Sequence, residues 1–542
     1  MRPTFAALCS IAFPFVAVLT SPLFAQESGH STESSNKLDE GLAHADGFTR
    51  VFVRMENQLF NSGDDYRQFI AMQPEDCKRL ELRVEVMGTL KENSERSFDP
   101  LEESVEALVE QGLARRVQRY WIVNGFACEA TAKGCDALAK MPGVGFVYRQ
   151  RFAAQQRAKR QRESEPDREL SALYARLLKG ADDLTEEAFD TDELEVPWNL
   201  ESVRADRAWS EHGVTGKGVV VAVLDDGMMP VPALLPALWK NPGETLNGED
   251  DDGNGLVDDV FGYDFKNNTP YCVTPSGHRH GTLCASVVAS RPTAGDKRLA
   301  TGVAPRATIM PLVGNGKLLA YEYALENGAD VLSMSYTFEP TKMGQYRGLF
   351  RTAHEHLAAA GIVSVGGAGN YAEKRPPGTQ VGSPKDIPCV IAAGGVGKNR
   401  RVTSFSSRGP VSWEGIRYFD EGAALDRAKP DVTTCNSDFP MWTLREIWEE
   451  AKAKRVENVV REDSEGYALV IGPRGNSFAG PHAAGVVALM FEANPQLPAW
   501  QVQRLLASTC KDLGERGHDP VYGAGMLQAD KAVEAARALS ND

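Results

Sequence analysis

Three short segments, far apart in the sequence, carry side chains suited to nucleophilic catalysis. Asp225 follows the apolar run Val221–Leu224, so its carboxylate comes at the end of a predicted buried strand. His280 opens an apolar helical stretch, where the helix dipole lowers proton affinity and favours a neutral base. Ser477 opens another such helix, whose backbone N–H groups would face a developing oxyanion. Together the three residue types predict acyl transfer by an activated hydroxyl.

Each segment also has an ordinary structural explanation when it is taken alone. Asp225 would serve as a strand-ending cap, and Ser477 would serve as a helix N-cap. His280 fits a surface histidine, and with His278 and Cys284 it has a spacing possible for zinc, although no second half of a ligand set is evident. Only the agreement of several separate segments decides between these interpretations.

A fourth segment is rich in oxygen ligands. Asp250, Asp252 and Asn254 alternate along the chain, and Gly255 and then Asp258 come after them. This order resembles the start of a calcium loop, in which alternation turns the oxygens inward and glycine permits the tight turn. We expect a structural Ca²⁺ bound by Asp250, Asp252, Asn254 and Asp258, because acidic side chains this close repel one another without a cation. A solvated acidic loop is the alternative.

The elements that must position these residues form an alternating pattern after Val196. Short apolar runs, predicted as strands, alternate with helical stretches; the strands are 218–224, 329–335, 361–366 and 390–394, and the helices are 282–289, 318–327, 344–360, 481–492 and 499–510. Such alternation is typical of parallel strands joined by crossover helices. The predicted fold class is therefore α/β, with a doubly wound, mostly parallel sheet.

The region before residue 151 predicts a small α+β module. Strands are expected at 49–54, 82–87, 118–123, 126–130 and 144–148, with helices at 100–112 and 134–140. The Asn124-Gly125 pair is a hairpin signal between two of the strands. Residues 151–195 are charged and helix-prone, and they predict a linker.

The first 25 residues have the pattern of an export signal. Arg2 precedes the apolar stretch Phe5–Leu19, and Ala25 ends a segment suited to cleavage. Pro14 and the short apolar run argue against a membrane anchor, and no later stretch approaches the roughly 20 apolar residues of a transmembrane helix. We expect a secreted protein, extracellular or periplasmic, with no membrane anchor after signal cleavage.

Composition excludes some partners. The 542 residues carry a formal net charge of −15, which argues against nucleic-acid binding because phosphate contacts need clustered Lys and Arg. Of nine cysteines, Cys9 leaves with the signal, and the disulfide pattern of the others is not readable from the sequence. We expect a monomer that has no nucleic-acid partner.

Taken together, the catalytic segments resemble those of subtilases, the S8-type serine peptidases. Asp225-Asp226-Gly227, His280-Gly281-Thr282 and Gly475-Asn476-Ser477 match the Asp, His and Ser motifs of that family in chain order, and Val363–Asn370 matches its oxyanion segment. Further matches extend the resemblance over roughly Pro197 to Ala536. Asp225-Asp226-Gly227 and Cys284-Ala285 look like the kexin branch, whereas Pro481-His482 looks like bacterial subtilisins.

The resemblance implies a secreted serine endopeptidase that hydrolyses peptide bonds in protein or peptide substrates. Ser477 would attack the carbonyl, His280 would transfer the proton, Asp225 would orient His280, and Asn370 would hold the oxyanion. Ser333, Met334, Ser335 and Gly382 would line the substrate groove. Gly382 would leave room for a large apolar P1 side chain, whereas Glu339 would favour a basic one, so the P1 preference stays open.

The resemblance also implies a self-processed zymogen. Residues 26–150 are similar to an inhibitor-like prodomain of the I9 type, which would act as an intramolecular inhibitor. The expected parts are a signal peptide (1–25), a propeptide (26–150), a linker with or near the processing site (151–195) and the peptidase domain (196–542). Arg157–Arg160 would suit self-processing by an enzyme that cuts at basic pairs.

Some positions depart from the family pattern, and two other functions stay open. Asn476 stands where Thr is usual, Phe478 stands where Met or a smaller residue is common, and a helix is expected at 444–455 in an insertion. A catalytically silent, calcium-dependent binding module is one alternative function. A metal-dependent hydrolase centred on His278, His280 and Cys284 is the other.

Overall fold

The part of the chain that the computed structural model describes comprises residues 37–150, 168–183, 196–275, 279–291, 302–417, 428–444, 458–462, 467–471 and 474–540. The chain divides into Met1–Lys37 and Leu38–Asp542, and every described helix and strand lies in the second unit. The predicted signal peptide and most of the predicted linker lie outside the described residues. Every cysteine from Cys77 to Cys510 lies within them and is a free thiol.

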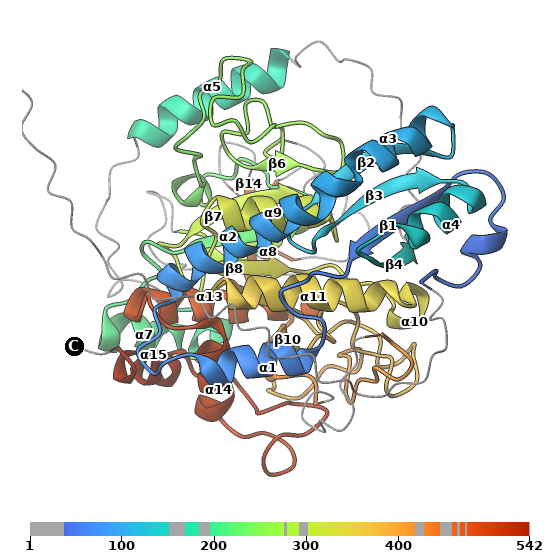
Figure 1. The fold of residues 1–542 in the computed structure, drawn as a ribbon. Coiled ribbons are helices and arrows are strands. Elements are labelled where there is room, and N and C mark those ends of the chain that lie inside the picture. Colours follow the sequence, from blue (N-terminus) through green and yellow to red (C-terminus); the bar gives the residue numbers. More distant parts are fainter. Residues whose placement is uncertain are drawn as a thin grey trace, which may run out of the picture. The chain divides into compact units, whose positions relative to one another are not determined.

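Residues 196–542, the C-terminal module, are built around a seven-stranded sheet of order β11-β10-β9-β8-β5-β7-β6 (Figure 1). All of its strand pairs are parallel. The strands are β5 (Val220–Asp225), β6 (Tyr263–Asp264), β7 (Thr308–Val313), β8 (Val331–Met334), β9 (Val363–Gly367), β10 (Ile391–Val396) and β11 (Val432–Cys435). Because their carboxyl ends lie along one edge, residues at the ends of different strands can meet there.

Helices cover both faces of this sheet. They are α6 (Trp198–Val203), α7 (Ala205–His212), α8 (Arg279–Ala289), α9 (Leu318–Glu326), α10 (Pro340–Met343), α11 (Tyr346–Ala359), α13 (Asn476–Ala493), α14 (Ala499–Thr509) and α15 (Ala529–Ala538). Ser364 of β9 contacts His354 of α11, with 3.0 Å between Oγ and Nδ1. Gly367, whose Cα faces the other way along the strand, packs against Asn476 of α13. The prediction of a doubly wound, mostly parallel sheet is therefore confirmed.

The N-terminal module, residues 38–150, contains a four-stranded sheet of order β2-β3-β1-β4 whose pairs are antiparallel. Its strands are β1 (Thr49–Met55), β2 (Ala114–Tyr120), β3 (Gly125–Ala130) and β4 (Val144–Arg149), and its helices are α1 (Gly63–Met72), α2 (Arg79–Phe98), α3 (Glu102–Glu110) and α4 (Ala132–Lys140). Its role as a prodomain stays a prediction. Further elements are α5 (Arg168–Asp183) and a small antiparallel sheet of β12 (Pro440–Leu444), β13 (Asn458–Glu462) and β14 (Tyr467–Ile471).

One strand prediction in the N-terminal module is wrong. Residues 82–87, expected as a strand, lie within α2. Leu82, Val86 and Leu90 are buried, and their four-residue spacing is that of one helix face. The alternation of apolar and charged residues over six positions was too short to distinguish the two periods. The helix expected at 444–455 begins at Leu444, which ends β12, and otherwise lies outside the described residues.

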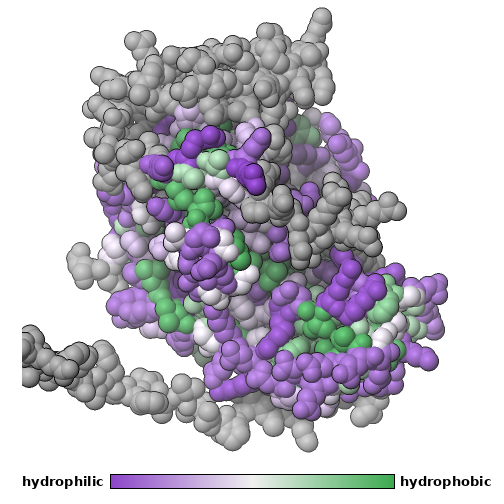
Figure 2. Space-filling model, turned by 90° about the horizontal axis from the view of Figure 1, so that it is seen from above, coloured by the Kyte–Doolittle hydropathy of each residue, from purple (hydrophilic) through white to green (hydrophobic). Residues whose placement is uncertain are grey.

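Polar and apolar residues are mixed over the described part of one face of the molecule. Figure 2 shows hydrophilic and hydrophobic residues interspersed over the face seen from above, with the hydrophobic ones in separate patches. Among the helices in the described ranges, none combines the length and apolar composition that crossing a membrane requires.

The buried helix α13 carries a histidine in a neutral, fully bonded state. His482 is 0% exposed; its Nδ1 lies 2.8 Å from the Phe478 carbonyl oxygen and its Nε2 lies 3.0 Å from Asn199 Nδ2. Nδ1 therefore donates and Nε2 accepts. Burial lowers the pKa of His482 to about 4, below its usual 6.5. The unfolded chain thus binds the proton more readily, and the resulting stability is lost as the pH falls from 6.5 towards 4.

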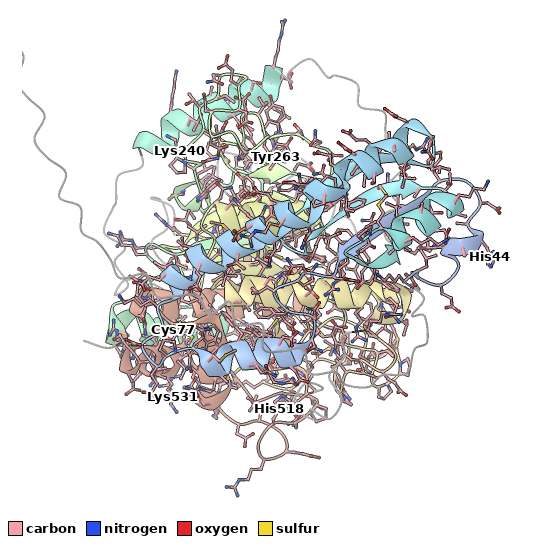
Figure 3. The ribbon with its side chains drawn as sticks, in the orientation of Figure 1. His44, Cys77, Lys240, Tyr263, His518 and Lys531 are labelled. Atoms are coloured by element: carbon pink, nitrogen blue, oxygen red, sulfur yellow. The ribbon has the colours of Figure 1, made fainter. Side chains whose placement is uncertain are left out.

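We predict that His482→Gln reduces the acid sensitivity of the fold. The unfolding free energy measured at pH 6.5 and 4.5 should fall less in the variant than in the parent protein, by about 2 kcal/mol. The exposed His518 (Figure 3) offers the matched control, since His518→Gln should leave the pH dependence unchanged. Equal acid sensitivity in His482→Gln and the parent would contradict the prediction.

Candidate active site

Asp225 and His280 meet at the carboxyl edge of the sheet. Asp225 ends β5 and is 5% exposed, and its Oδ1 lies 2.7 Å from His280 Nδ1. The same oxygen accepts the backbone N–H of Asp226 at 2.9 Å. Because a carboxylate accepts only, Nδ1 carries the proton and Nε2 is left as the basic nitrogen. The sequence placed both residues at a candidate site, and the structure brings them together.

A second carboxylate fixes the helix that carries the histidine. Asp226 Oδ1 accepts the backbone N–H of Gly281 at 2.6 Å, and its Oδ2 accepts that of His280 at 3.3 Å. A negative charge at the start of α8 is favourable because these N–H groups lack partners within the helix. Gly281 lies so close to the Gly227 carbonyl oxygen that a Cβ would overlap it. The adjacent acids thus have distinct tasks: Asp225 holds the imidazole, and Asp226 holds the helix.

The buried thiol of Cys284 also lies close to the His280 imidazole. Cys284 Sγ lies 3.9 Å from His280 Nδ1, one helical turn away on α8. A thiolate at Cys284 and the carboxylate of Asp225 would each raise the pKa of His280. Burial raises the pKa of the Cys284 thiol as well, so the thiol is neutral and the standing charge beside the imidazole is that of Asp225. Ligand atoms of the three residues lie within 4.8 Å of one another; His278 lies outside the described residues.

Ser477 is the second residue of α13, and Pro481 shapes its surroundings. Proline has no N–H to donate to the carbonyl four residues earlier, so the Ser477 carbonyl is left free by the helix. That oxygen accepts instead from Ser335 Oγ at 2.7 Å and from Cys284 Sγ at 3.5 Å. The Ser477 hydroxyl lies 3.4 Å from the Ser335 carbonyl oxygen, a long contact that is easily broken.

Asn370 lies beside the start of the same helix. Its Oδ1 accepts the backbone N–H of Asn476 at 2.8 Å, which orients the amide. Its Nδ2 is turned toward Gly475, where an added Cβ would lie 3.4 Å away. The amide donor is therefore held next to the turn that precedes Ser477. An N–H donor fixed in that position can stabilise negative charge on a bound carbonyl oxygen.

Asn476, a departure from the family pattern, ties this turn to its surroundings. Its side chain is 0% exposed and donates through Nδ2 to Gly369 O at 2.8 Å and to Ser406 Oγ at 2.9 Å. Its Oδ1 accepts from Asn436 Nδ2 at 2.8 Å. Sequence reasoning did not assign Ser406 and Asn436 to the site. The only signal for them was their place within the stretch Pro197 to Ala536 that resembles the family, and nothing there predicted which side chain faces Asn476.

The residues predicted to line the substrate groove differ in how deeply they are buried. Ser333 and Met334 end β8 and are 1% and 0% exposed, whereas Ser335 is partly exposed and contacts Ser477. Gly382 is covered by the Thr337 side chain, whose Cγ2 leaves no room for a Cβ at that position. Of these four residues, Ser335 therefore lies nearest the nucleophile. The room above Gly382 that we expected for a large P1 side chain is occupied by the Thr337 side chain.

In the acidic loop, the residues that the sequence predicts as calcium ligands make hydrogen bonds within the loop. Asp250 accepts backbone N–H groups of its own turn, including that of Gly255 at 2.8 Å. Asp258 Oδ1 accepts those of Asn247 and Gly248 at 2.8 and 2.9 Å, so it braces the loop. Asn254 donates its amide to Asp252 at 3.0 Å.

Glu244, which sequence reasoning did not select, joins the loop from outside. Oxygens of Glu244, Asp250 and Asp252 lie within 4.8 Å of one another. Glu244 and Asp259 are 7% and 0% exposed, and Glu244 Oε2 and Asp259 Oδ1 have no hydrogen-bond partner among the described residues. Burial first, and then neighbouring carboxylates, raise the pKa of both acids. Buried, unsatisfied carboxylate oxygens in such a cluster fit a hard divalent cation.

The chain is similar in sequence to known proteins. The sequence profile of the Subtilase family matches residues 216–525. Subtilisin DY of Bacillus licheniformis is 27% identical over 351 residues, which cover 62% of this chain and 99% of that protein. Fervidolysin of Fervidobacterium pennivorans is 26% identical over 62% of this chain and 43% of its own length. Bacillopeptidase F of Bacillus subtilis (strain 168) is 24% identical over 84% of this chain and 29% of its own length. The chain thus spans less than half of the last two relatives.

We predict that Asp225, and not Cys284, sets the proton affinity of His280. The pKa of the His280 imidazole, measured by NMR, should lie above 6.5. Asp225→Asn should lower it, because the neutral amide no longer favours the imidazolium. Cys284→Ala should leave it nearly unchanged, since a neutral thiol contributes no charge. A large fall in Cys284→Ala would mean that the sulfur is a thiolate.

Proposed function

This chain belongs to the subtilase family and is a serine-type peptidase, and on that premise we propose that Asp225, His280 and Ser477 form the catalytic triad of an endopeptidase. The observation that carries the proposal is the 2.7 Å contact between Asp225 Oδ1 and His280 Nδ1 beside the helix start that holds Ser477. Protein and peptide chains are the proposed substrates. Similarity of the chain to subtilisins supports this assignment.

In the proposed reaction, each residue of the site has a defined role. The Ser477 hydroxyl gives up its long contact with the Ser335 carbonyl, turns to His280 Nε2 and loses its proton as Oγ attacks the scissile carbonyl carbon. The negative charge that forms on the substrate oxygen is held by Asn370 Nδ2 and the backbone N–H of Ser477. His280 then gives the proton to the leaving amine, and water completes hydrolysis of the acyl-enzyme by the same route. Asp225 stabilises the imidazolium throughout.

The proposal also covers export of the protein and its maturation from a precursor. The apolar stretch before Ala25 supports export of a precursor, and the resemblance of residues 26–150 to an inhibitory prodomain supports self-processing in the linker. In this scheme the precursor stays inactive until the chain is cut after the N-terminal module. The mature enzyme then acts outside the cytoplasm as a monomer.

The first test compares wild type with Ser477→Ala and Asn370→Ala. Wild type should be cut in the linker and digest casein, whereas Ser477→Ala should stay full length and inert, because no hydroxyl can attack. Asn370→Ala should process and lose about 100- to 1000-fold in kcat, the usual cost of one oxyanion donor.

Ser508→Ala, at an exposed serine of α14, is the matched control and should retain full activity. Equal behaviour of wild type and Ser477→Ala would leave Ser477 as a helix cap and favour a silent binding module. Inhibition by a chelator but not by a serine-reactive phosphonate would favour the metal-dependent hydrolase. The pocket geometry at Ser335 and Thr337 leaves the P1 preference to a peptide-library assay.

We further propose that the acidic loop binds a structural Ca²⁺. Glu244, Asp250 and Asp252, with Asp259 next to the loop, would hold the ion, because the buried Glu244 and Asp259 each have an oxygen with no partner among the described residues. Asp258 and Asn254, part of the set expected from the sequence, would brace the loop. A bound cation would neutralise the cluster and favour the folded state.

Calcium removal tests this second proposal. Ca²⁺ at about 100 times its Kd should add about 2.7 kcal/mol to the unfolding free energy and raise Tm. Glu244→Gln should abolish most of that gain, whereas Glu249→Gln, at an exposed acid in the same loop, should keep it. The experiment uses the Ser477→Ala protein so that digestion does not distort the melting curves. A Tm that ignores both EDTA and Ca²⁺ would overturn the proposal.

A further inference from the structure

Arg79, at the start of α2 in the N-terminal module, is almost completely enclosed by the C-terminal module. Its side chain is 3% exposed, and its Nη1 lies 2.7 Å from Asp330 Oδ1. Its Nε donates to the Pro495 carbonyl at 2.9 Å, and the guanidinium lies 4.1 Å from the centre of the Phe491 ring. The backbone N–H of Arg79 also donates to Gln496 O at 3.1 Å. The C-terminal module therefore encloses the Arg79 side chain and supplies a partner for its charge and for its N–H groups. We call this set of contacts the arginine socket.

A second arginine, one turn along α2, faces the same acid. Arg83 Nη2 donates to Ala329 O at 2.8 Å and lies 3.5 Å from Asp330 Oδ1. The other oxygen of Asp330 accepts the backbone N–H of Val220 at 3.0 Å. Among the described residues, both cations that pair with this buried carboxylate come from the N-terminal module. Without that module, Asp330 would be an uncompensated acid at the base of β8.

Two more polar groups of the C-terminal module find their partners across the same interface. Glu322 of α9 accepts the backbone N–H groups of Trp121 and Ile122 at 2.6 and 2.9 Å. His356 of α11 lies 2.6 Å from the Ile122 carbonyl through Nδ1 and accepts the Phe60 N–H through Nε2 at 3.3 Å. Both side chains are buried, and burial lowers the pKa of His356 to about 4, so it is neutral there.

Apolar packing continues between these polar contacts. The rings of Phe60 and His356 have centroids 5.3 Å apart, and those of Phe69 and Trp500 are 6.3 Å apart. Phe52 of β1 lies against Tyr346 of α11. Residues of the N-terminal module belong to the same hydrophobic cluster as the sheet and helices of the C-terminal module. Separating the modules would expose apolar surface together with the buried polar groups.

The arginine socket lies far from the catalytic edge. Asp330 precedes β8, so it lies at the amino end of that strand, whereas Asp225 ends its neighbour β5. Phe491 is near the end of α13, about 20 Å along the helix from Ser477. Cys77, two residues before Arg79, lies beside the C-terminal helices in Figure 3. The anchor thus holds the N-terminal module without covering Ser477.

We propose that the N-terminal module is a permanent subunit of the enzyme, anchored by Arg79 and Arg83 on Asp330, and that it stays bound after the connecting chain is cut. A cut in the connecting chain then leaves the module in place on the C-terminal module. The anchor rests on contacts and not on the proposed catalysis, so it is testable in an inactive protein.

The test uses full-length Ser477→Ala with a site for a sequence-specific protease placed between residues 151 and 167. After cutting, the two pieces should elute together from a size-exclusion column at about 100 nM, a dilution that separates micromolar complexes. Arg79→Met in this protein should weaken the association at least ~100-fold, because a buried carboxylate loses its closest cation. Before cutting, the intact linker keeps the modules at high effective concentration, so the variant should fold.

Arg96→Met, on the same helix, is the matched control: Arg96 is exposed and pairs with Glu92 of its own helix. Its pieces should stay together like those of the parent. Separation of the parent pieces on dilution would overturn the proposal, and co-elution of the Arg79→Met pieces with unchanged affinity would remove Arg79 as the anchor. Far-UV circular dichroism of each uncut protein distinguishes loss of binding from loss of folding.

Discussion

The site depends on how closely the start of α13 approaches the end of β9. Gly367 has no side chain to separate the strand from Asn476, and Gly480 lies against the same strand from within the helix. This contact sets Ser477 beside the loop that carries Asn370. Pro481 then leaves the Ser477 carbonyl free for Ser335. A larger residue at Gly367 would move the nucleophile relative to its oxyanion donor and to the histidine on α8.

The buried carboxylates discussed above are subject to one physical constraint. Asp225 keeps His280 as its partner, Asp330 keeps two arginines, and Glu322 receives two backbone N–H groups. An acid removed from water needs a cation or several donors, since its desolvation is otherwise uncompensated. Glu244 Oε2 is one of the buried carboxylate oxygens that no described residue satisfies, and its place in an acidic cluster is why we propose a cation there. The catalytic pair, the interdomain anchor and the acidic loop are three solutions to this constraint.

The N-terminal module contacts the C-terminal module through several of its elements. Its four-stranded sheet meets α9 and α11 through the turn at Trp121 and Ile122. Between β1 and the body of α2, the chain makes an additional passage through Phe60 and α1 to the arginine socket. The Ile122 carbonyl and the Phe60 N–H meet on the same side chain, His356, and the arginine socket lies further along, near the end of α13.

The sequence by itself determined the parallel sheet, because short apolar strands alternating with helices have few other ways to bury both faces of a sheet. It also placed Asp225, His280, Ser477 and Asn370 at strand or helix ends, through motifs whose spacing is local. It did not identify Glu244, the partner of Asp330 or the place of Asn476, and it assigned a strand to the start of α2. Those features depend on which distant segments meet. A buried polar group is satisfied by partners hundreds of residues away, so only the tertiary structure decides them.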